Sequence, residues 1–426
     1  MPRFFQRVFI GGSILISTVS LTLLFSTIFP VYLSVLIVGT IFATFFLLMG
    51  KWIFGARKLA MDSFMRVTTG LFASVVVAMV AFLMFAIVEG GYEKFTLEFL
   101  TSHPAEGFLE GGIFPMIVGT AMLVIIMSVV GVPVGVMTAI YLTEYAKESS
   151  LIARTIRFCL NVLAGIPPIV IGLFGLGFFI ATIGRSIDTY NAELKYNEFA
   201  ETLREKGSPV AGEAKTPLSK TITYLERTAP EKWKDEIVRL RSVEEANPGI
   251  ALTAKDIDEF FVSTESAIWG RPSLLWAALT MALLTLPVVV VSVEEAIRAV
   301  PRELREASYS LGGSRLETVV RVILPSSSSG IATGTILAVS RGAGEVAPIL
   351  FTGVAYFLPD IPSSLHSQFM ELGYHIYILA TQSTNVAVTV PMQFATTLAL
   401  LLLTFSLNFT AIVLRARLQT QRAKYA

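Results

Sequence analysis

This chain of 426 residues has little charge and almost no cysteine. Charged residues make up 15% of it, where soluble globular proteins have about 25%, and hydrophobic residues make up 54%. This composition excludes an ordinary water-soluble domain and indicates that lipid is the main solvent. The single cysteine, Cys159, cannot form an internal disulfide, and the sequence around it has no cysteine or histidine cluster for a metal.

The sequence also lacks an excess of either charge, since its formal net charge is +1. No basic stretch therefore argues for nucleic acid as a partner. The pattern G-x-x-x-x-G-K-[ST], whose backbone cradles nucleotide phosphates, is absent as well. The chain is thus not expected to be an enzyme by itself, and an ATP-driven activity would require separate ATPase subunits.

Long uncharged runs dominate the sequence instead. Because a bilayer core about 30 Å thick requires about 20 apolar residues of helix, runs of that length predict membrane spans. The predicted fold is an all-α integral membrane protein with about eight transmembrane helices. The first run is longer than the ~7–15 apolar residues of a signal peptide and is expected to be retained. The runs cover approximately residues 8–29, 31–49, 67–88, 115–141, 158–183, 274–293, 328–357 and 393–414.

The distribution of Lys and Arg predicts the orientation, because these residues resist translocation across the membrane. They gather at both chain ends and in alternate connections. The opposite connections are acidic over residues 89–114 and free of Lys and Arg over residues 358–392. Both termini are therefore expected on the cytoplasmic side.

One long hydrophilic stretch, residues 184–271, interrupts the spans, and the helix count alone places it outside the cytoplasm. Thr228 and Glu231 form a candidate capping box before an amphipathic run that includes Trp233, which predicts at least one helix. Two interpretations remain: a solvated helical insert, or a docking surface for an external partner.

The connection over residues 294–325 carries strong local signals for two short helices. Pro301 suits the start of the first helix, and Gly312 supplies its stop. The second is expected to begin with the capping box Ser314–Glu317 and to end at Pro325. The sequence therefore predicts a cytoplasmic elbow, which could also be an amphipathic element lying on the membrane surface.

This connection resembles the "EAA" loop of the permease subunits of binding-protein-dependent ABC importers. The pattern reads Glu306-Ala307-Ser308, three residues, Gly312, nine residues, then Val322 to Pro325. Ser308 replaces the second alanine and Val322 replaces isoleucine. The resemblance implies that the first helix enters a cleft of a cytoplasmic ATPase and transmits its closure to the membrane. The residues implied in this coupling are Arg302, Glu306, Ala307, Ser308, Gly312, Leu324 and Pro325.

Further segments resemble the phosphate-importer permease family PstA. They are GGIFPMIVGT (111–120), YLTEY (141–145), LAGIPPIVIGLFG (163–175), EEAIRAV (294–300) and RGAGEVAPILFTG (341–353). The resemblance implies a prokaryotic plasma (inner) membrane complex with PstB-like ATPase subunits that hold ATP-Mg, a PstC-like second permease and an external PstS-like phosphate-binding protein. This chain would bind no cofactor.

The same resemblance implies a type I permease core of six helices with two additions. The expected parts are an N-terminal transmembrane hairpin with a cytoplasmic linker (1–66), the first part of the core (67–183), the insert (184–271), the second part of the core with the coupling loop (272–415) and a basic cytoplasmic tail (416–426).

Two charges, Arg341 and Glu345, are predicted to lie in the middle of the seventh span, four residues apart on one helix face. A charge at mid-bilayer costs about 2.5–3.5 kcal/mol on insertion scales, so such residues usually face the protein interior or a water-filled path. They could form a structural ion pair, or Arg341 could bind a tetrahedral anion while Glu345 orients it. Glu345 could also accept a hydrogen bond from protonated phosphate, which sulfate cannot offer.

Three alternatives remain open. A permease for sulfate, molybdate or another small solute would keep the coupling loop without the anion site. A secondary transporter would be expected to show inverted repeats and broken helices. A receptor or scaffold would not depend on Glu306 and Gly312.

Overall fold

The computed structural model describes residues 57–105, 111–147, 149–205, 208–210, 215–383 and 386–423. The two spans expected over 8–29 and 31–49 lie outside these residues, as does the end of the basic tail. The chain divides into two units, residues 1–89 and 90–426. The described part of the first unit is one helix, α3 (Arg57–Gly91), whose last two residues belong to the second.

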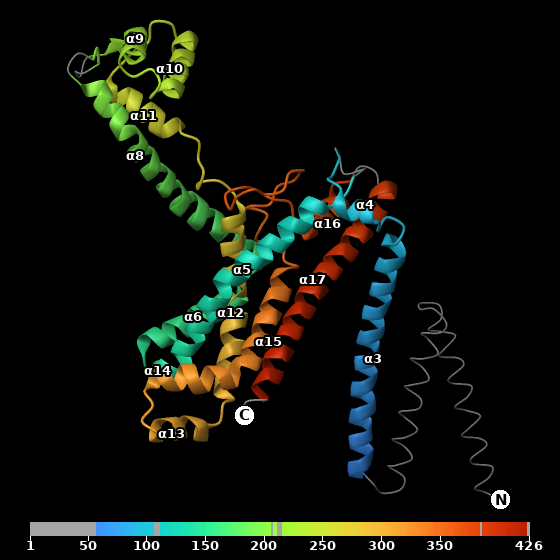
Figure 1. Cartoon of the computed structure of the whole chain (residues 1–426). Helices are drawn as coiled ribbons and strands as arrows, with labels where there is room; N and C mark the ends of the chain where they lie inside the picture. Colours follow the sequence, from blue (N-terminus) through green and yellow to red (C-terminus); the bar gives the residue numbers. More distant parts are fainter. Residues whose placement is uncertain are drawn as a thin grey trace, which may run out of the picture. The chain divides into compact units, whose positions relative to one another are not determined.

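The described structure is mainly helical, with two strands of two residues each, which confirms the all-α prediction (Figure 1). Six of its helical segments are long and apolar enough to cross a membrane. They are Phe72–Gly91 in α3, Phe114–Tyr145, Pro168–Arg204, Leu274–Arg298, Arg315–Gly342 and Val386–Thr410.

These segments are built from helices of different regularity. The second joins α5 (Phe114–Ile140) to the π-helix η2 (Tyr141–Tyr145), and the third joins α7 (Pro168–Phe174), η3 (Gly175–Gly184) and α8 (Arg185–Arg204). The others are α12 (Leu274–Arg298), the run α14 (Arg315–Thr318), η4 (Val319–Ile323) and α15 (Leu324–Gly342), and α17 (Val386–Ala423). Shorter helices are α4 (Leu97–Thr101), α6 (Leu151–Gly165) and α16 (Leu372–Thr381).

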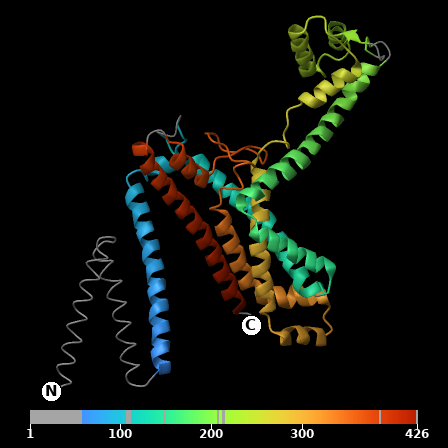
Figure 2. The same cartoon turned by 180° about the vertical axis from the view of Figure 1, so that it is seen from behind.

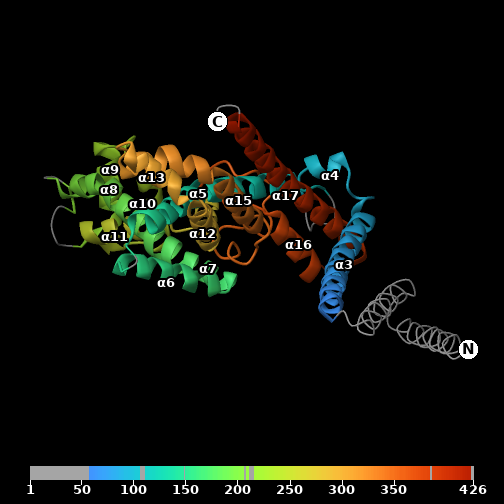
Figure 3. The ribbon, with the colours of Figure 1, turned by 90° about the horizontal axis from the view of Figure 1, so that it is seen from below.

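α12 is the most buried of these helices and packs against both α5 and α15 (Figure 3). Small residues permit the close approach. A Cβ on Gly135 of α5 would lie 2.5 Å from Cγ1 of Val289, and one on Gly334 of α15 would overlap Ser292. Substitution of either glycine would therefore push a neighbouring helix away from α12.

Two predicted spans differ from the structure. The span expected over 158–183 is broken: α6 ends at Gly165, Ile166 and Pro167 are extended, and α7 begins at Pro168. Pro167 and Pro168 lack the N–H groups that a continuous helix would use.

The span expected over 328–357 instead ends at Gly342, and the chain continues in turns to Gly353. Glycines 342 and 344, followed by Pro348, disfavour a continued helix. The final turn is fixed by the Ser273 N–H, which donates to the Thr352 carbonyl at 2.8 Å.

The hydrophilic stretch forms a helical unit with its own core (Figures 1 and 2). Its fully buried side chains include Tyr196, Phe199 and Phe261, and the rings of Tyr196 and Phe261 stack at 5.1 Å. After α8 its elements are the paired strands β1 (Thr216–Pro217) and β2 (Ala251–Leu252) and the helices α9 (Leu218–Thr228), α10 (Lys234–Ala246) and α11 (Ala254–Thr264).

The capping box expected at Thr228 and Glu231 is wrong, although the helix predicted to follow it is present as α10. Thr228 is the last residue of α9, and its hydroxyl donates back to the Tyr224 carbonyl. The capping box of this unit is instead Thr253 with Asp256, at the start of α11. Thr-x-x-Glu is therefore an ambiguous signal when a helix can end on the same threonine.

Candidate functional site

The coupling loop begins with α13 (Arg302–Ser310), a helix none of whose residues is buried. It starts after Pro301, and Gly312 ends the turn beyond it with a φ of +81°, the left-handed conformation that favours glycine. The exposed fraction of Leu311 is 90%, and that of Leu304 is 44%. Arg302 and Glu306 are exposed, and their side chains form no hydrogen bond or ion pair within the described chain. α13 therefore presents both apolar and charged groups outward.

One side chain of α13 is turned inward. Nη1 of Arg305 lies 3.0 Å from Oε1 of Glu144, and its Nη2 donates to the Ile297 carbonyl at 2.7 Å. Glu144 belongs to η2 and is only 6% exposed. A buried carboxylate is costly unless a cation neutralises it, so this ion pair ties α13 to the end of α5, while the hydrogen bond ties it to the end of α12.

A second ion pair joins α6 to α12 near the Glu144–Arg305 pair. Arg157 of α6 lies 3.3 Å from Glu294 of α12 and donates to the Leu142 carbonyl at 3.4 Å. Sequence reasoning missed both pairs. The one clue in the sequence is Glu144, a lone carboxylate at the end of an apolar run, where it needs a cationic partner. The sequence contains many arginines and does not show which of them is that partner.

The second helix of the loop begins with the predicted capping box, because the Ser314 hydroxyl accepts from the Glu317 N–H and the Glu317 carboxylate accepts from the Ser314 N–H. A hydrogen bond of 2.8 Å between the hydroxyls of Ser308 and Thr318 joins the two helices.

The expectation that Pro325 ends this helix is wrong. α14, η4 and α15 form one continuous helical segment, in which Leu324 and Pro325 are the first residues of α15. Pro is tolerated in a first helical turn, where the missing N–H costs least. The π-helix η4 ends immediately before Leu324, so Pro325 lies in the first turn of a new α-helical stretch. α14 is thus joined to α15 without an intervening loop.

The Arg341–Glu345 pair forms, but not in the middle of a helix. Nε of Arg341 lies 3.9 Å from Oε1 of Glu345, in the last turn of α15 and the turn that follows. The exposed fractions of the two side chains are 50% and 27%. A pair so open to its surroundings contributes little stability and leaves guanidinium N–H groups available to an anion. Gly342 fixes this helix end by packing against the Met127 side chain of α5.

A buried polar group lies beside the start of α16. The Glu371 carboxylate accepts from the N–H groups of Gly373 and Tyr374, at 2.8 and 2.7 Å, and so caps the helix. Burial raises the pKa of Glu371 to about 7, against a smaller opposing effect of these hydrogen bonds. His375 is also buried, and burial lowers its pKa to about 4, which keeps the imidazole neutral.

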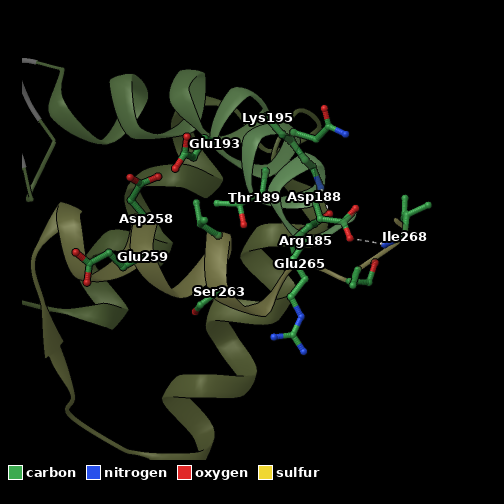
Figure 4. A pocket seen from close by; sticks show the side chains of 15 residues that line it. Arg185, Asp188, Thr189, Glu193, Lys195, Asp258, Glu259, Ser263, Glu265 and Ile268 are labelled. Atoms are coloured by element: carbon green, nitrogen blue, oxygen red, sulfur yellow. Dashed lines mark hydrogen bonds and ion pairs between the residues drawn. The ribbon is translucent and has the colours of Figure 1, made fainter. Parts of the chain in front are cut away.

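A pocket lies between α8 and α11 of the insert (Figure 4). Its charged lining is mostly acidic, with Glu193, Asp258 and Glu259 beside one another. Burial raises the pKa of Asp258, Arg204 opposes that rise, and the charges of Glu259 and Glu193 add to it. Such a lining repels an anion, so this pocket does not compete with Arg341 as an anion site. Within the described residues no group of three or more potential metal ligands is present.

Comparison with known families matches residues 131–420 to the binding-protein-dependent transport system inner membrane component. The matched region includes the whole coupling loop, Glu144, Arg341 and Glu345.

Among curated relatives, the phosphate transport system permease protein PstA 1 of Mycobacterium tuberculosis is 28% identical over 289 residues, 66% of each chain. The probable ABC transporter permease protein YqgI of Bacillus subtilis is 26% identical over 67% of this chain and 69% of the relative. The phosphate transport system permease protein PstC of Pasteurella multocida is 24% identical over 74% and 87%.

The match to PstA 1 thus spans slightly less than two thirds of that relative's length. The family model, by contrast, covers more than half of this chain and contains both the exposed helix α13 and the continuous segment that leads from it to Arg341. The chain belongs to the binding-protein-dependent transport system inner membrane components and is a permease of an ABC transporter, a transport component rather than a catalytic enzyme.

Proposed function

We propose that this chain is the membrane-spanning permease subunit of an ATP-driven importer that moves inorganic phosphate into the cytoplasm. The observation that carries the proposal is the coupling loop, because α13 and the residue that follows it expose the side chains of Arg302, Glu306 and Leu311 without partners of their own in the described chain. Such a helix suits a cleft in a partner protein. Relatives named as phosphate permeases support the choice of substrate.

The proposal includes the partners that such a permease requires. PstB-like ATPase subunits would bind ATP-Mg and hold α13, a PstC-like permease would complete the pathway, and a PstS-like protein would deliver phosphate from outside. The subunit would lie in the prokaryotic plasma membrane with both termini in the cytoplasm. The additions at 1–66 and 184–271 would flank the transport core.

Arg341 would contribute positive charge to the phosphate path, and Glu345 would orient it. Their separation of 3.9 Å and their exposure leave room for the anion beside the guanidinium group. Because the pair is loose, phosphate would be attracted without being trapped. Glu345 would also accept a hydrogen bond from protonated phosphate.

The test is ATP-dependent uptake of radiolabelled phosphate into vesicles that hold this chain and its co-expressed partners, with ATP hydrolysis followed in parallel. Loss of a charge-assisted hydrogen bond in Arg341→Gln is expected to lower uptake by at least about tenfold while hydrolysis continues. Arg204→Gln, which removes an exposed arginine of α8, is the matched control and should leave uptake unchanged.

Two results would contradict parts of this proposal. If the wild-type complex hydrolyses ATP but moves sulfate or another solute instead of phosphate, the substrate assignment falls and the permease function stands. If Glu345→Gln keeps the wild-type rate and the preference for phosphate over sulfate, Glu345 has no part in selectivity.

A further inference from the structure

We propose that the ion pair between Arg305 and Glu144 is the joint through which movement of α13 reaches α5, and that it sets how efficiently ATP hydrolysis changes the conformation at Arg341. This inference rests on the proposed coupling function of α13. Arg305 and Glu144 are positioning residues in it, since neither lies in the proposed phosphate path.

The contacts of α13 single out Arg305. In the described chain only two of its side chains bond to another helix, Arg305 and Ser308. Ser308 reaches Thr318 in the same loop, which moves with α13 in any case. Among the side chains of α13, Arg305 is the one that bonds to η2 and to the last turn of α12, through Glu144 and the Ile297 carbonyl. Elsewhere in the loop, Arg315 of α14 adds a cation–π contact with Tyr145 of η2.

The environment of the pair makes it suited to transmit a displacement. The Glu144 side chain is 6% exposed and that of Arg305 is 24% exposed, so solvent screens their attraction little. Separation of the two groups would leave a buried carboxylate without a counter-charge. Moving η2 together with α13 is therefore easier than breaking the contact.

A continuous path leads from this pair to Arg341. η2 is the direct continuation of α5, and the Met127 side chain in the middle of α5 packs against Gly342. Gly342 follows Arg341 in the last turn of α15. α13 thus acts on this helix end from two directions: through α14, η4 and α15 along the chain, and through Glu144 and α5 across it. The ion pair keeps the two movements in register.

The experiment uses the complete complex in a Cys159→Ser background, with a cysteine placed at Gly344. Gly344 is exposed and a Cβ there meets no atom within 4 Å, so the substitution should be tolerated next to Glu345. Maleimide labelling of this cysteine is measured with and without ATP and vanadate, alongside ATP hydrolysis and co-purification of the subunits. This readout requires no transported phosphate.

In the parent complex, trapping with ATP and vanadate is expected to change the labelling rate. In Arg305→Gln and in the double variant Glu144→Gln/Arg305→Gln, that change should shrink by about 5-fold or more while hydrolysis persists, as expected for a lost coupling free energy. The double variant leaves no buried charge unpaired, so it guards against simple misfolding. Arg305→Lys should restore part of the response. Arg239→Gln, which removes a half-buried ion pair of the insert with Glu265, is the matched control.

A purely structural role predicts another pattern. If assembled double variants respond to ATP as the parent does, or if hydrolysis and labelling response fall in proportion, the joint is refuted. A parent complex that hydrolyses ATP without any labelling change refutes it too. A parent that responds to ATP but moves no phosphate refutes only the proposed substrate and leaves the joint supported.

Discussion

The coupling loop and the insert contain the same local capping and turn motifs, but they differ in how much of their surface is buried. Each has a capping box, Ser314–Glu317 in the loop and Thr253–Asp256 in the insert. Each also turns at a glycine with a φ of +81°, Gly312 or Gly249. The insert then buries its aromatic side chains in a core of its own, whereas α13 buries nothing. The insert therefore has a core of its own, whereas α13 has none.

The charges of the two regions show the same contrast. In the insert, Glu265 pairs with both Lys195 and Arg239 at 2.9 and 3.2 Å. In α13, Arg302 and Glu306 have no such partners within the described chain, and only Arg305 is paired. Charged side chains without partners in the described chain are available to form ion pairs with another protein.

The largest expected difference comes from the two glycines. A left-handed conformation costs an L-residue about 1–2 kcal/mol, and a Cβ meets no atom within 4 Å at either position, so Gly312→Val and Gly249→Val impose the same local strain. Gly312→Val should lower phosphate uptake at least about tenfold, as for other losses of coupling, and Gly249→Val should leave it unchanged. Equal losses of uptake would contradict a coupling role that belongs to the loop and not to the insert.

Phe261→Ala tests whether the insert is held by its own core. Phe261 is fully buried against Tyr196 and Phe199, so its truncation should cost about 3–5 kcal/mol of local stability. Limited proteolysis of the complex should then cut between residues 185 and 267, while ATP hydrolysis persists. Val238→Ala, at a position 62% exposed, is the control and should change protection little. Loss of hydrolysis in Phe261→Ala would tie the insert to coupling.

Caps in buried and exposed settings should respond to pH in opposite directions. The raised pKa of Glu371, about 7, means that the stabilisation of its neutral form is fully present below about 4.5 and is lost as pH rises through about 7. Hydrogen bonds from Thr253 lower the pKa of Asp256, so its contribution is present above about 3.8 and is lost as pH falls through that lowered pKa.

In the wild type, the free energy of unfolding should fall by up to about 2–3 kcal/mol as pH rises from 5 to 8, and Glu371→Gln should abolish this fall. The measurement is the pH dependence of the melting temperature of the complex. Asp256→Asn should change that dependence only on the acid side. A wild-type melting temperature that rises steadily from pH 5 to 8, unaltered by Glu371→Gln, would contradict this account of the buried cap.

The smallest expected effect comes from the capping boxes. Ser314→Ala and Thr253→Ala should each cost about 1 kcal/mol of local helix stability. Only Ser314→Ala is expected to lower the phosphate transported per ATP hydrolysed, by a few-fold, because α14 continues into α15. If Thr253→Ala lowers this ratio by the same factor, the insert shares in coupling.

Features encoded locally could be predicted from the sequence, and contacts between distant segments could not. The elbow of the coupling loop followed from Pro301, Gly312 and Ser314–Glu317 because capping depends on neighbouring residues. The spacing of Arg341 and Glu345 predicted their pairing. Their place at a helix end was missed because apolar composition does not show where Gly342 and Pro348 stop the helix.

The joint at Arg305 was beyond sequence reasoning for a different reason. Glu144 lies at the end of one membrane segment and Arg305 in the loop that follows another, and their meeting depends on how α5 packs against α12. The clamp at the base of the insert is similar: Asp188 accepts from the N–H groups of Ile268 and Trp269 at 3.1 and 3.0 Å, far along the chain. Hydropathy identifies the helices that pack, but not which side chains meet when they do.

The most direct test of the account places a photo-reactive residue at either Leu311, beside α13, or Val238, on the insert, which are 90% and 62% exposed. Crosslinking is then measured in the complex with its ATPase subunits. We expect a crosslink to the ATPase from position 311 and none from position 238. An ATPase crosslink from position 238, or its absence from position 311 in a complex that hydrolyses ATP, would contradict it.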